Sequence, residues 1–425
     1  MIRYKKATTT ILAATLIFFT ACGANNDDNP QITPDIPHQI TDDEYPQNED
    51  DEIANDMNLG QKIDHYMEMY HQNLRGLAIS IFTKDDMILE IEYGYADVEA
   101  ALAVDADTVF EWGATTKQLV WISVMQLYER GELDLHADIF TYISKTDFPN
   151  IIYPTTLFHL MHHTAGFDDY ANFGFAEMMF GMVDDVVPTL EALFEDMTAS
   201  EYAIQNRQPG EQIRYSAYGI ILASYVVQQV SGVPFYEYVH SNIFAPLGMH
   251  QTALRPDMSD NQWVKEQREK IKIYDIWGLQ SFQRTQMLAY PAGAAVGTIS
   301  DMIKFARAIM PDENGESVLF EYAETLSMLH PSLVDIQNAP VCELIPTNPA
   351  FFYGIGIFPE QSQNPDFTRV IGHLGGTSGF RTFWFIDIDR GIGMVMGENT
   401  SHGLAGVDGF FEFFTHEIPR LASDL

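Results

Sequence analysis

Short apolar runs typical of β-strands lie toward both ends of this 425-residue sequence, and helical patterns lie between them. Residues 77–83 and 87–93 flank a polar turn, which predicts a β-hairpin. Further strands are expected at 352–358, 370–374, 382–388 and 391–396, and helices at 53–72, 119–130, 218–230, 302–310 and 407–421. This order predicts an α+β fold in which the first and last thirds of the chain meet in one sheet.

The amino-terminal residues 1–21 have the pattern of an export signal. Three basic residues precede an apolar stretch of 15 residues, which is shorter than the roughly 20 needed to span a bilayer as a helix. Phe19-Thr20-Ala21 then precedes Cys22 as in a bacterial lipobox, with phenylalanine in place of the usual leucine-like residue. We therefore expect a lipid on Cys22 that anchors the chain at the extracytoplasmic face of a bacterial cell membrane. The alternative is an ordinary signal with an incidental cysteine.

Residues 22–56 have the composition of a disordered, acidic tether. From Cys22 to Gln61 there are 11 acidic residues and no Lys or Arg, so this run repels itself and has little apolar surface to bury. A dedicated acidic binding tail is the alternative interpretation. The folded domain, expected at 57–425, is acidic as well, because 49 acidic and 20 basic residues follow Gln61, which is a net charge of −29. This charge excludes nucleic acid as an electrostatic partner.

The first segment with catalytic chemistry comes just before the apolar helix expected at 119–130. A nucleophile at a helix amino terminus gains from the positive end of the helix dipole and from N–H groups without intrahelical partners. A lysine three positions further lies on the same helix face and can act as a base in a desolvated pocket. The pattern sought is Ser-x-x-Lys, but the sequence has Ala114 at its first position and Lys117 at its last.

Two further segments place polar groups next to turns. Tyr215 follows a Pro-Gly turn, can present its phenol to a cleft, and is followed two positions later by Ala217. His373 lies in a glycine-rich run between two expected strands, together with Gly375 and Gly376. Glycines let a ligand lie close to a strand backbone, and His373 would place a polar or cationic group beside that ligand.

Together these segments resemble the serine β-lactamase and penicillin-binding protein superfamily, most closely its class C β-lactamase, D-peptidase and esterase branch. Supporting likenesses lie at 157–166, 246–249, 291–293 and 300–302. The resemblance implies a β-lactamase/transpeptidase-like fold, an antiparallel sheet flanked by helices plus a helical subdomain. It also implies a small-molecule or peptide ligand such as a cell-wall peptide, a β-lactam or an ester. We expect no metal and no cofactor.

The resemblance also implies roles for individual residues. A serine at the position of Ala114 would attack a carbonyl carbon and form an acyl-enzyme, while Lys117 and Tyr215 would share its proton. His373 has the position of a Lys or His that tunes the field near a substrate carboxylate. The substrate and oxyanion positions are Ala114, Ala217, Gly375 and Gly376. Among them, the backbone N–H groups of Ala114 and Gly376 would bind the oxyanion, and the family has asparagine at position 217.

The chain departs from this pattern at two positions, because Ala114 has no hydroxyl and Ala217 has no amide. It is a natural non-catalytic relative, an engineered variant, or a protein with a substitute nucleophile. The nearest hydroxyls belong to Thr115, Thr116 and Ser216. Successive helical residues are about 100° apart, so Thr115 should face away from the site, and Ser216 should diverge from its neighbour Tyr215.

Other polar residues near these segments have simpler interpretations. His159, His162 and His163 fall at helical spacing, but we expect them to form a structural turn rather than to bind a metal. We expect Asp168 and Asp169 to be solvated loop carboxylates rather than part of a cleft.

Two functions are compatible with the sequence. The first is an extracytoplasmic homologue that is catalytically impaired and binds wall-peptide or acyl ligands. The second is an active acyl-serine hydrolase, that is, a D-Ala-D-Ala peptidase, a β-lactamase or an esterase. The residues at 114 and 217 favour the first function, whereas the retention of Lys117, Tyr215 and His373 favours the second.

Overall fold

The computed structural model describes residue 61 and residues 75–169, 180–182, 186–199, 204–274, 285–329, 338–342 and 370–400. The chain divides into two compact units, Asn73–His402 and the pair of segments Met1–Gln72 and Gly403–Leu425. Apart from residue 61, every described residue belongs to Asn73–His402. The expected signal, the tether, the helices at 53–72 and 407–421 and the strand at 352–358 lie outside the described residues.

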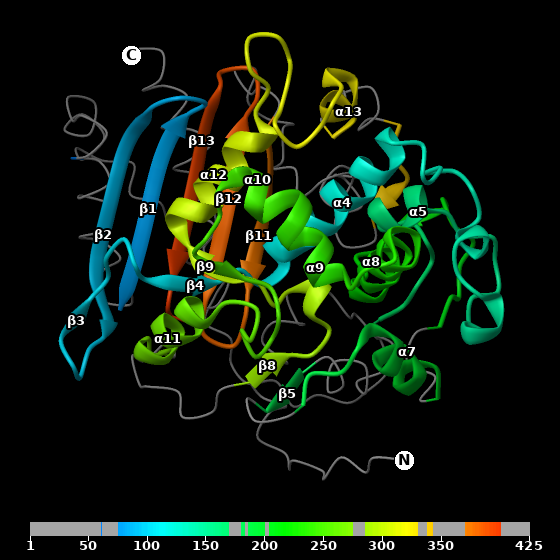
Figure 1. Ribbon diagram of the computed structural model, residues 1–425, viewed down its shortest axis with the longest axis horizontal. Helices are drawn as coiled ribbons and strands as arrows, with labels where there is room; N and C mark the ends of the chain where they lie inside the picture. The colour runs from blue at the N-terminus through cyan, green and yellow to red at the C-terminus, as the bar shows by residue number, and fades with distance from the viewer. Residues whose placement is uncertain are drawn as a thin grey trace, which may run out of the picture. The chain divides into compact units, whose positions relative to one another are not determined.

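The main sheet contains six antiparallel strands in the order β11-β12-β13-β1-β2-β3 (Figure 1). Its strands are β1 (Gly76–Thr83), β2 (Met87–Asp97), β3 (Leu102–Ala103), β11 (Val370–Gly376), β12 (Arg381–Asp387) and β13 (Ile392–Glu398). β1 pairs with β13, with Leu77 opposite Glu398 and Thr83 opposite Ile392. The prediction that the first and last thirds of the chain share a sheet is therefore confirmed, as are the hairpin and the three late strands within the described residues.

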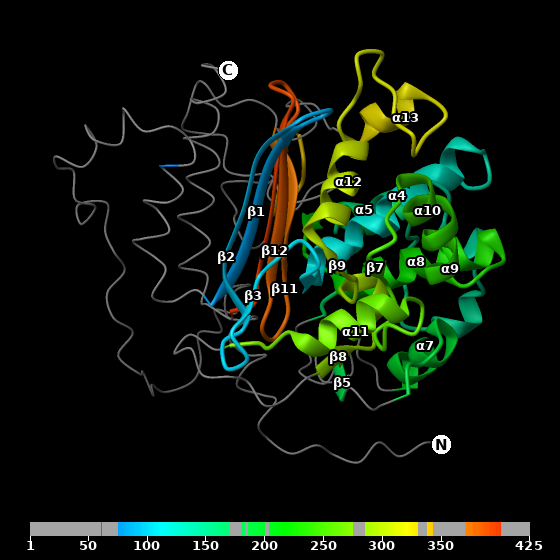
Figure 2. The same cartoon turned by 60° about the vertical axis from the view of Figure 1, so that its left-hand side comes forward.

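Helices pack against one face of this sheet, with α12 nearest to it and α4 and α8 beyond α12 (Figure 2). The helices are α4 (Lys117–Glu129), α5 (Leu157–Met161), α7 (Leu190–Ala199), α8 (Ala217–Ser231), α9 (Phe235–Val239), α10 (Ala245–Leu247), α11 (Gln262–Lys270), α12 (Ile299–Ile309) and α13 (Ala323–Met328). Those expected at 119–130, 218–230 and 302–310 are confirmed as α4, α8 and α12. None of the helices within the described ranges is long and apolar enough to cross a membrane.

Short strands and turns connect the sheet to the helices. A second antiparallel sheet contains β4 (Val109–Glu111), β9 (Val296–Thr298) and β7 (Thr252–Ala253). Two further pairs are the antiparallel β5 (Phe180–Met182) with β8 (Thr285–Met287) and the parallel β6 (Gln212–Ile213) with β10 (Val341–Cys342). β4 leads directly into α4 through the turn that carries Ala114, so the second sheet positions the start of α4.

Candidate active site

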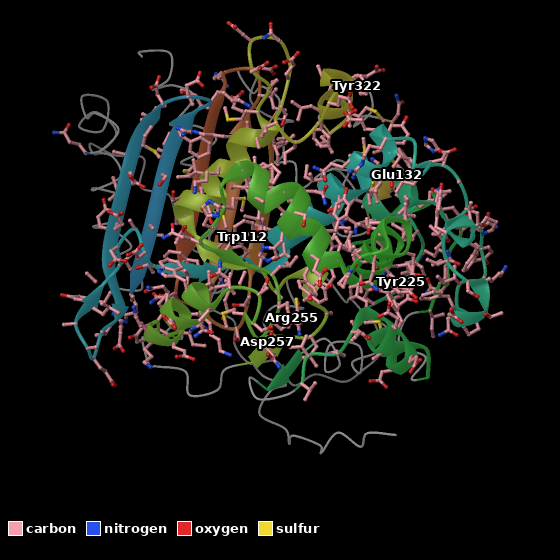
Figure 3. All side chains as sticks on the ribbon, viewed as in Figure 1. Trp112, Glu132, Tyr225, Arg255, Asp257 and Tyr322 are labelled. Atoms are coloured by element: carbon pink, nitrogen blue, oxygen red, sulfur yellow. The ribbon has the colours of Figure 1, made fainter. Side chains whose placement is uncertain are left out.

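Ala114 lies in the 3-10 helix η1 (Gly113–Thr116), which joins β4 to α4. The backbone N–H of Trp112 donates to Ala295 O at 2.8 Å, and the Trp112 side chain is buried (Figure 3). This anchor fixes the turn, and α4 begins at its end with Lys117. Ala114 is half-buried there, and its methyl group carries no reactive atom.

The backbone of β11 lies directly on this turn. A β-carbon at Gly113, whose φ is +51°, would lie 2.3 Å from the Gly376 nitrogen, and one at Gly375 would lie 1.9 Å from Trp112 O. Both positions therefore need glycine, because no side chain tolerates such an approach. The sequence interpretation assigned Gly375 to the approach of a ligand, whereas the structure shows that it admits the Trp112 backbone. The same packing places the Gly376 N–H beside Gly113.

Lys117 and Tyr215 lie close together in the structure. The Lys117 side chain is 4% exposed, and its Nζ donates to Ala292 O at 2.6 Å. The same Nζ lies 5.2 Å from the centroid of the Tyr215 ring, which is half-buried at the end of the segment before α8. The Lys117 ammonium therefore lies over the face of the Tyr215 ring, which attracts a cation.

His373 completes this group from strand β11. Its ring centroid lies 6.3 Å from that of Tyr215, and its side chain is 2% exposed. Burial, and then the nearby Lys117 ammonium, lower the pKa of His373 to about 3. Its Nδ1 donates to Leu374 O at 2.6 Å. His373 is therefore neutral at neutral pH, so it acts as a polar group rather than the cation that the sequence left open.

Two aspartates hold the segment that carries Tyr215. Asp169 Oδ1 accepts from Ser216 Oγ at 2.9 Å, and its Oδ2 accepts from the backbone N–H groups of Ala217 and Tyr218. Asp168 pairs with Arg214 at 2.7 Å. The expectation that these carboxylates are solvated was wrong, because Asp168 is 7% and Asp169 2% exposed. Asp169 replaces water as the hydrogen-bond partner of the amino terminus of α8, which is a favourable place for negative charge.

The burial of Asp169 also changes its acid strength. Desolvation raises the pKa of its carboxyl to about 6, although its hydrogen bonds to Tyr218, Ser216 and Ala217 oppose that shift. Asp169 is thus mostly ionised at neutral pH and gains protons only below it.

His163 is a site residue that the sequence analysis did not select. Its ring centroid lies 4.5 Å from that of Tyr215, and its Nδ1 accepts from the Ser216 backbone N–H at 3.2 Å. Burial comes first, and the charge of Lys117 second, among the causes that lower its pKa well below the usual value. Its φ of +55° is uncommon for a residue other than glycine, and no sequence signal reveals it.

The nearby hydroxyls are engaged elsewhere. Thr115 Oγ1 donates to Trp112 O at 2.7 Å, and Thr116 Oγ1 accepts from the Ala295 backbone N–H at 3.1 Å. Ser216 Oγ donates to Asp169 and accepts from Gly219 N–H as the amino-terminal cap of α8. All three side chains are buried. Their hydrogen bonds turn them toward the protein framework, as the sequence predicted for Thr115 and Ser216.

The other two histidines of this region stabilise the turn around α5. His159 Nδ1 and Thr156 form a capping box at the start of the helix. The His162 ring stacks on Phe158 with centroids 4.0 Å apart, and burial lowers the pKa of His162 to about 4. In the described part of the chain, no group of three or more His, Cys, Asp or Glu side chains has an arrangement that holds a metal ion.

The fold and the clustering of Lys117, Tyr215 and His373 beside the η1 turn define the β-lactamase/transpeptidase-like class of proteins. The chain belongs to the β-lactamase family, whose family model matches residues 59–410.

Several characterised proteins are similar to this chain. Penicillin-binding protein 4* of Bacillus subtilis is 24% identical over 321 residues, which cover 72% of this chain and 64% of that protein. A D-aminopeptidase of Gluconobacter oxydans is 26% identical over 183 residues, 42% of this chain and 32% of its own length. The chain thus spans less than two thirds of the length of these relatives.

Solved structures share the fold. A β-lactamase/D-alanine carboxypeptidase from Yersinia pestis superposes with a TM-score of 0.63 and 18% identity, over 85% of this chain and 97% of that one. The penicillin-binding protein homologue from Pyrococcus abyssi superposes with a TM-score of 0.61 and 24% identity, over 81% of this chain and 74% of that one.

Proposed function

We propose that this protein is a catalytically impaired homologue of the β-lactamase family that binds a wall peptide or another acyl ligand without forming an acyl-enzyme. The observation that carries the proposal is the methyl group of Ala114 at the position where the family has its serine. The engagement of Thr115, Thr116 and Ser216 in buried hydrogen bonds supports it, because none of these hydroxyls is left to act in its place.

The remaining groups would recognise the carbonyl end of an acyl ligand. The N–H groups of Ala114 and Gly376 would donate to the carbonyl oxygen, and the close packing of Gly113 on Gly376 supports this pairing. Lys117 and Tyr215 would face the leaving-group side, where they would move a proton if a nucleophile were present. Ala217 offers no amide, so the ligand would be held less firmly than in relatives with asparagine.

Substitution of Ala114 by serine tests this proposal. The unmodified chain should show no burst of nitrophenol from a short-chain nitrophenyl ester, because loss of a nucleophile of this kind costs on the order of 10⁶ in turnover. Ala114→Ser should restore a partial burst, and Ala114→Ser with Ala217→Asn a larger one, since poor substrate placement costs about 100-fold. Lys117→Ala in the serine background is the control and should abolish the burst. No burst in the double variant, with folding confirmed by circular dichroism, would contradict the proposal that the site keeps its ligand.

The second candidate is an active acyl-serine-type hydrolase, and the clustering of Lys117, Tyr215 and His373 favours it. Intact-mass analysis after incubation with a fluorescent penicillin separates the two candidates. A stable mass increase that maps to residues 113–117 of the unmodified chain would establish covalent chemistry. The first candidate predicts an unchanged mass.

The location of the protein is a further part of the proposal. A signal at 1–21, a lipid on Cys22 and a tether at 22–56 would hold a domain at 57–425 outside the cell membrane. Cys22→Ser should therefore release the protein from membranes into the soluble extracytoplasmic fraction. If the serine variant pellets with membranes as before, the lipobox interpretation is wrong.

A further inference from the structure

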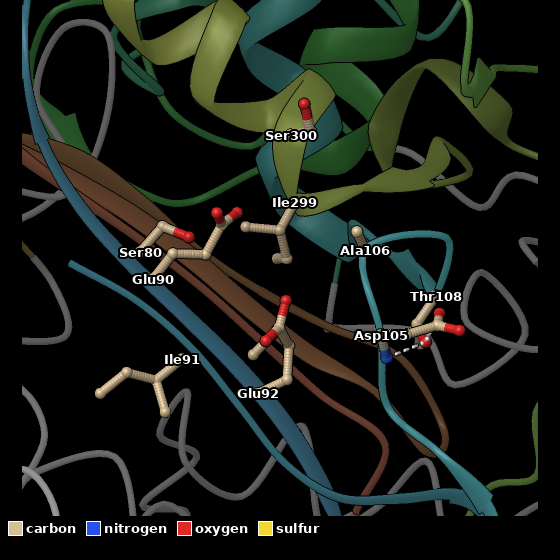
Figure 4. Close-up of a pocket in the computed structure, with 10 residues that line it drawn as sticks. Ser80, Glu90, Ile91, Glu92, Asp105, Ala106, Thr108, Ile299 and Ser300 are labelled. Carbon is tan, nitrogen blue, oxygen red and sulfur yellow. Dashed lines mark hydrogen bonds between the residues drawn. The ribbon is translucent and has the colours of Figure 1, made fainter. Parts of the chain in front are cut away.

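A second candidate site lies away from the Ala114 turn, between the β1–β2 hairpin and the start of α12 (Figure 4). It is a hollow of about 290 Å³ that opens to solvent. The residues that line it are Ala78, Ser80, Glu90, Ile91, Glu92, Asp105, Ala106, Thr108, Ile299 and Ser300.

Three carboxylates crowd this hollow without a compensating cation. Glu90, Glu92 and Asp105 line it, and in the described part of the chain no Lys or Arg does so. Asp105 Oδ1 accepts from Thr108 Oγ1 at 2.9 Å and from the Asp107 backbone N–H at 3.1 Å, so this carboxylate also stabilises its own turn. Burial, followed by the charges of Glu90 and Asp105, raises the pKa of Glu92. The three groups thus repel one another.

The hydroxyl at the base of the hollow provides an independent observation. Ser80 is 1% exposed, and its Oγ has no hydrogen-bond partner in the structure. The register of the hairpin puts Ser80 opposite Glu90 and Ala78 opposite Glu92, so all four side chains lie on one face of the two strands. A buried hydroxyl without a partner costs free energy that a ligand with a hydrogen-bond donor would recover.

We propose that this hollow binds the ammonium group of an alkylamine, such as a lysine side chain or a small primary amine. One –NH₃⁺ group carries three donors and a positive charge, so it meets the needs of Ser80 Oγ and of the Glu90 and Glu92 carboxylates together. Ala78, Ala106 and Ile299 provide apolar walls for the alkyl stem, which a bare metal ion would not use.

The test is saturation-transfer difference NMR of n-butylammonium chloride with the full chain in non-ionic detergent at neutral pH. We expect a saturable signal, and we expect the affinity to fall about tenfold in Ser80→Ala and in Glu90→Gln. The first substitution removes a hydrogen-bond acceptor for the ammonium, and the second removes a negative charge next to it. Asp85→Asn is the matched control. It removes an exposed carboxylate from the turn of the same hairpin, outside the hollow, and should leave the affinity unchanged.

Competition with other cations distinguishes the ligand classes. Tetramethylammonium has the same charge but no N–H donor, so it should displace n-butylammonium poorly, and potassium chloride at equal ionic strength should do the same. If tetramethylammonium displaced n-butylammonium as well as unlabelled n-butylammonium does, the binding would depend on charge alone. If potassium did so, the hollow would be a site for inorganic cations. Either result overturns the proposal, as does a signal that is absent or unchanged in both variants.

Thermal unfolding provides a second measurement that does not depend on NMR. Without amine, Ser80→Ala should unfold at a higher temperature than the unmodified chain, because it removes a buried hydroxyl that lacks a partner. Addition of n-butylammonium should raise the unfolding temperature of the unmodified chain more than that of the variant. The proposed role of Ser80 would be contradicted if Ser80→Ala were less stable than the unmodified chain and if n-butylammonium raised the unfolding temperature of both proteins equally.

Discussion

Two loop-to-helix junctions build the candidate active site, and they are held in place by different forces. The turn before α4 has no side-chain cap and is fixed by backbone packing, with β11 pressed against Trp112 and Gly113. The segment before α8 is held by side chains from one loop, above all Asp169 and His163. The first junction therefore depends on shape, and the second on hydrogen bonds and charge.

This difference decides which substitutions each junction tolerates. At the first junction, the close backbone packing leaves no room for a β-carbon. The turn from Trp112 to Thr116 contains no titratable residue, so we expect its packing to be insensitive to pH. Hydrogen bonds to the buried Asp169 carboxylate and His163 imidazole leave more room for substitution, yet they change when these groups are protonated. Lys117 and Tyr215 are thus positioned by two different junctions. The first is disrupted by added side-chain volume, and the second by a change in protonation.

The largest effect is expected at Gly113. Gly113→Ala and Gly391→Ala both place alanine at a positive φ, +51° and +67°, but only the first also meets the Gly376 backbone. The shared strain costs about 1–2 kcal/mol. Overpacking at Gly113 should add about 1–3 kcal/mol. Urea unfolding of the two variants measures the difference, and equal losses would show that β11 does not fix the turn by close packing.

Asp169→Ala should have the next largest effect. It leaves the buried N–H groups of Ala217 and Tyr218 without an acceptor, and we expect a loss of about 2–4 kcal/mol in the free energy of unfolding. Asp138→Ala is the matched control, because Asp138 accepts from a single backbone N–H, that of Phe140, and should cost about 1 kcal/mol. In the Ala114→Ser background, Asp169→Ala should also slow acylation, since Tyr215 loses its support. Normal acylation in a destabilised variant would mean that Asp169 supports only the fold.

The sequence predicts the strands and helices of the described residues well, because those depend on local apolar patterns. It also brings Lys117, Tyr215 and His373 together through the family resemblance. It does not reveal Asp169 or His163, since their partners lie about 50 residues further along the chain and polar loop residues are usually solvated. The resemblance brings the N–H groups of Ala114 and Gly376 together, but it does not reveal that Gly113 packs against the Gly376 backbone too closely for a β-carbon.

Buried titratable groups in and around the candidate active site should make stability depend on pH. His162, His163 and His373 are neutral in the fold, with the pKa lowered to about 4 in His162 and about 3 in His373, but they bind protons once unfolded. Each therefore lowers stability as pH falls below about 6.5, by up to about 1.4 kcal/mol per pH unit. Asp169 and Glu398 act in the opposite direction, because burial raises their pKa to about 6 and about 7. Three histidines outweigh two acids, so these groups together lower stability between pH 6.5 and pH 4.

A single substitution isolates the contribution of His163. The unmodified chain should be more stable than His163→Gln at pH 7, and this difference should shrink as pH falls, since the variant has one proton fewer to gain on unfolding. The cost of Gly113→Ala should stay constant over the same range. Urea unfolding at several pH values measures both. A pH-independent difference for His163→Gln would mean that folding leaves the pKa of His163 unchanged.

The smallest effect is expected where the first junction does use side-chain hydrogen bonds. Thr382 Oγ1 and Thr115 Oγ1 both donate to Trp112 O, at 2.8 and 2.7 Å, and the Thr115 backbone N–H donates to it at 3.2 Å. Thr382→Val should therefore cost only about 1 kcal/mol, because the carbonyl keeps two donors. Thr115→Val with Thr382→Val should cost about 0.5 kcal/mol more than the sum of the single losses, as one donor then remains. A loss in Thr382→Val as large as that in Asp169→Ala would mean that side-chain hydrogen bonds, rather than backbone packing, hold the turn.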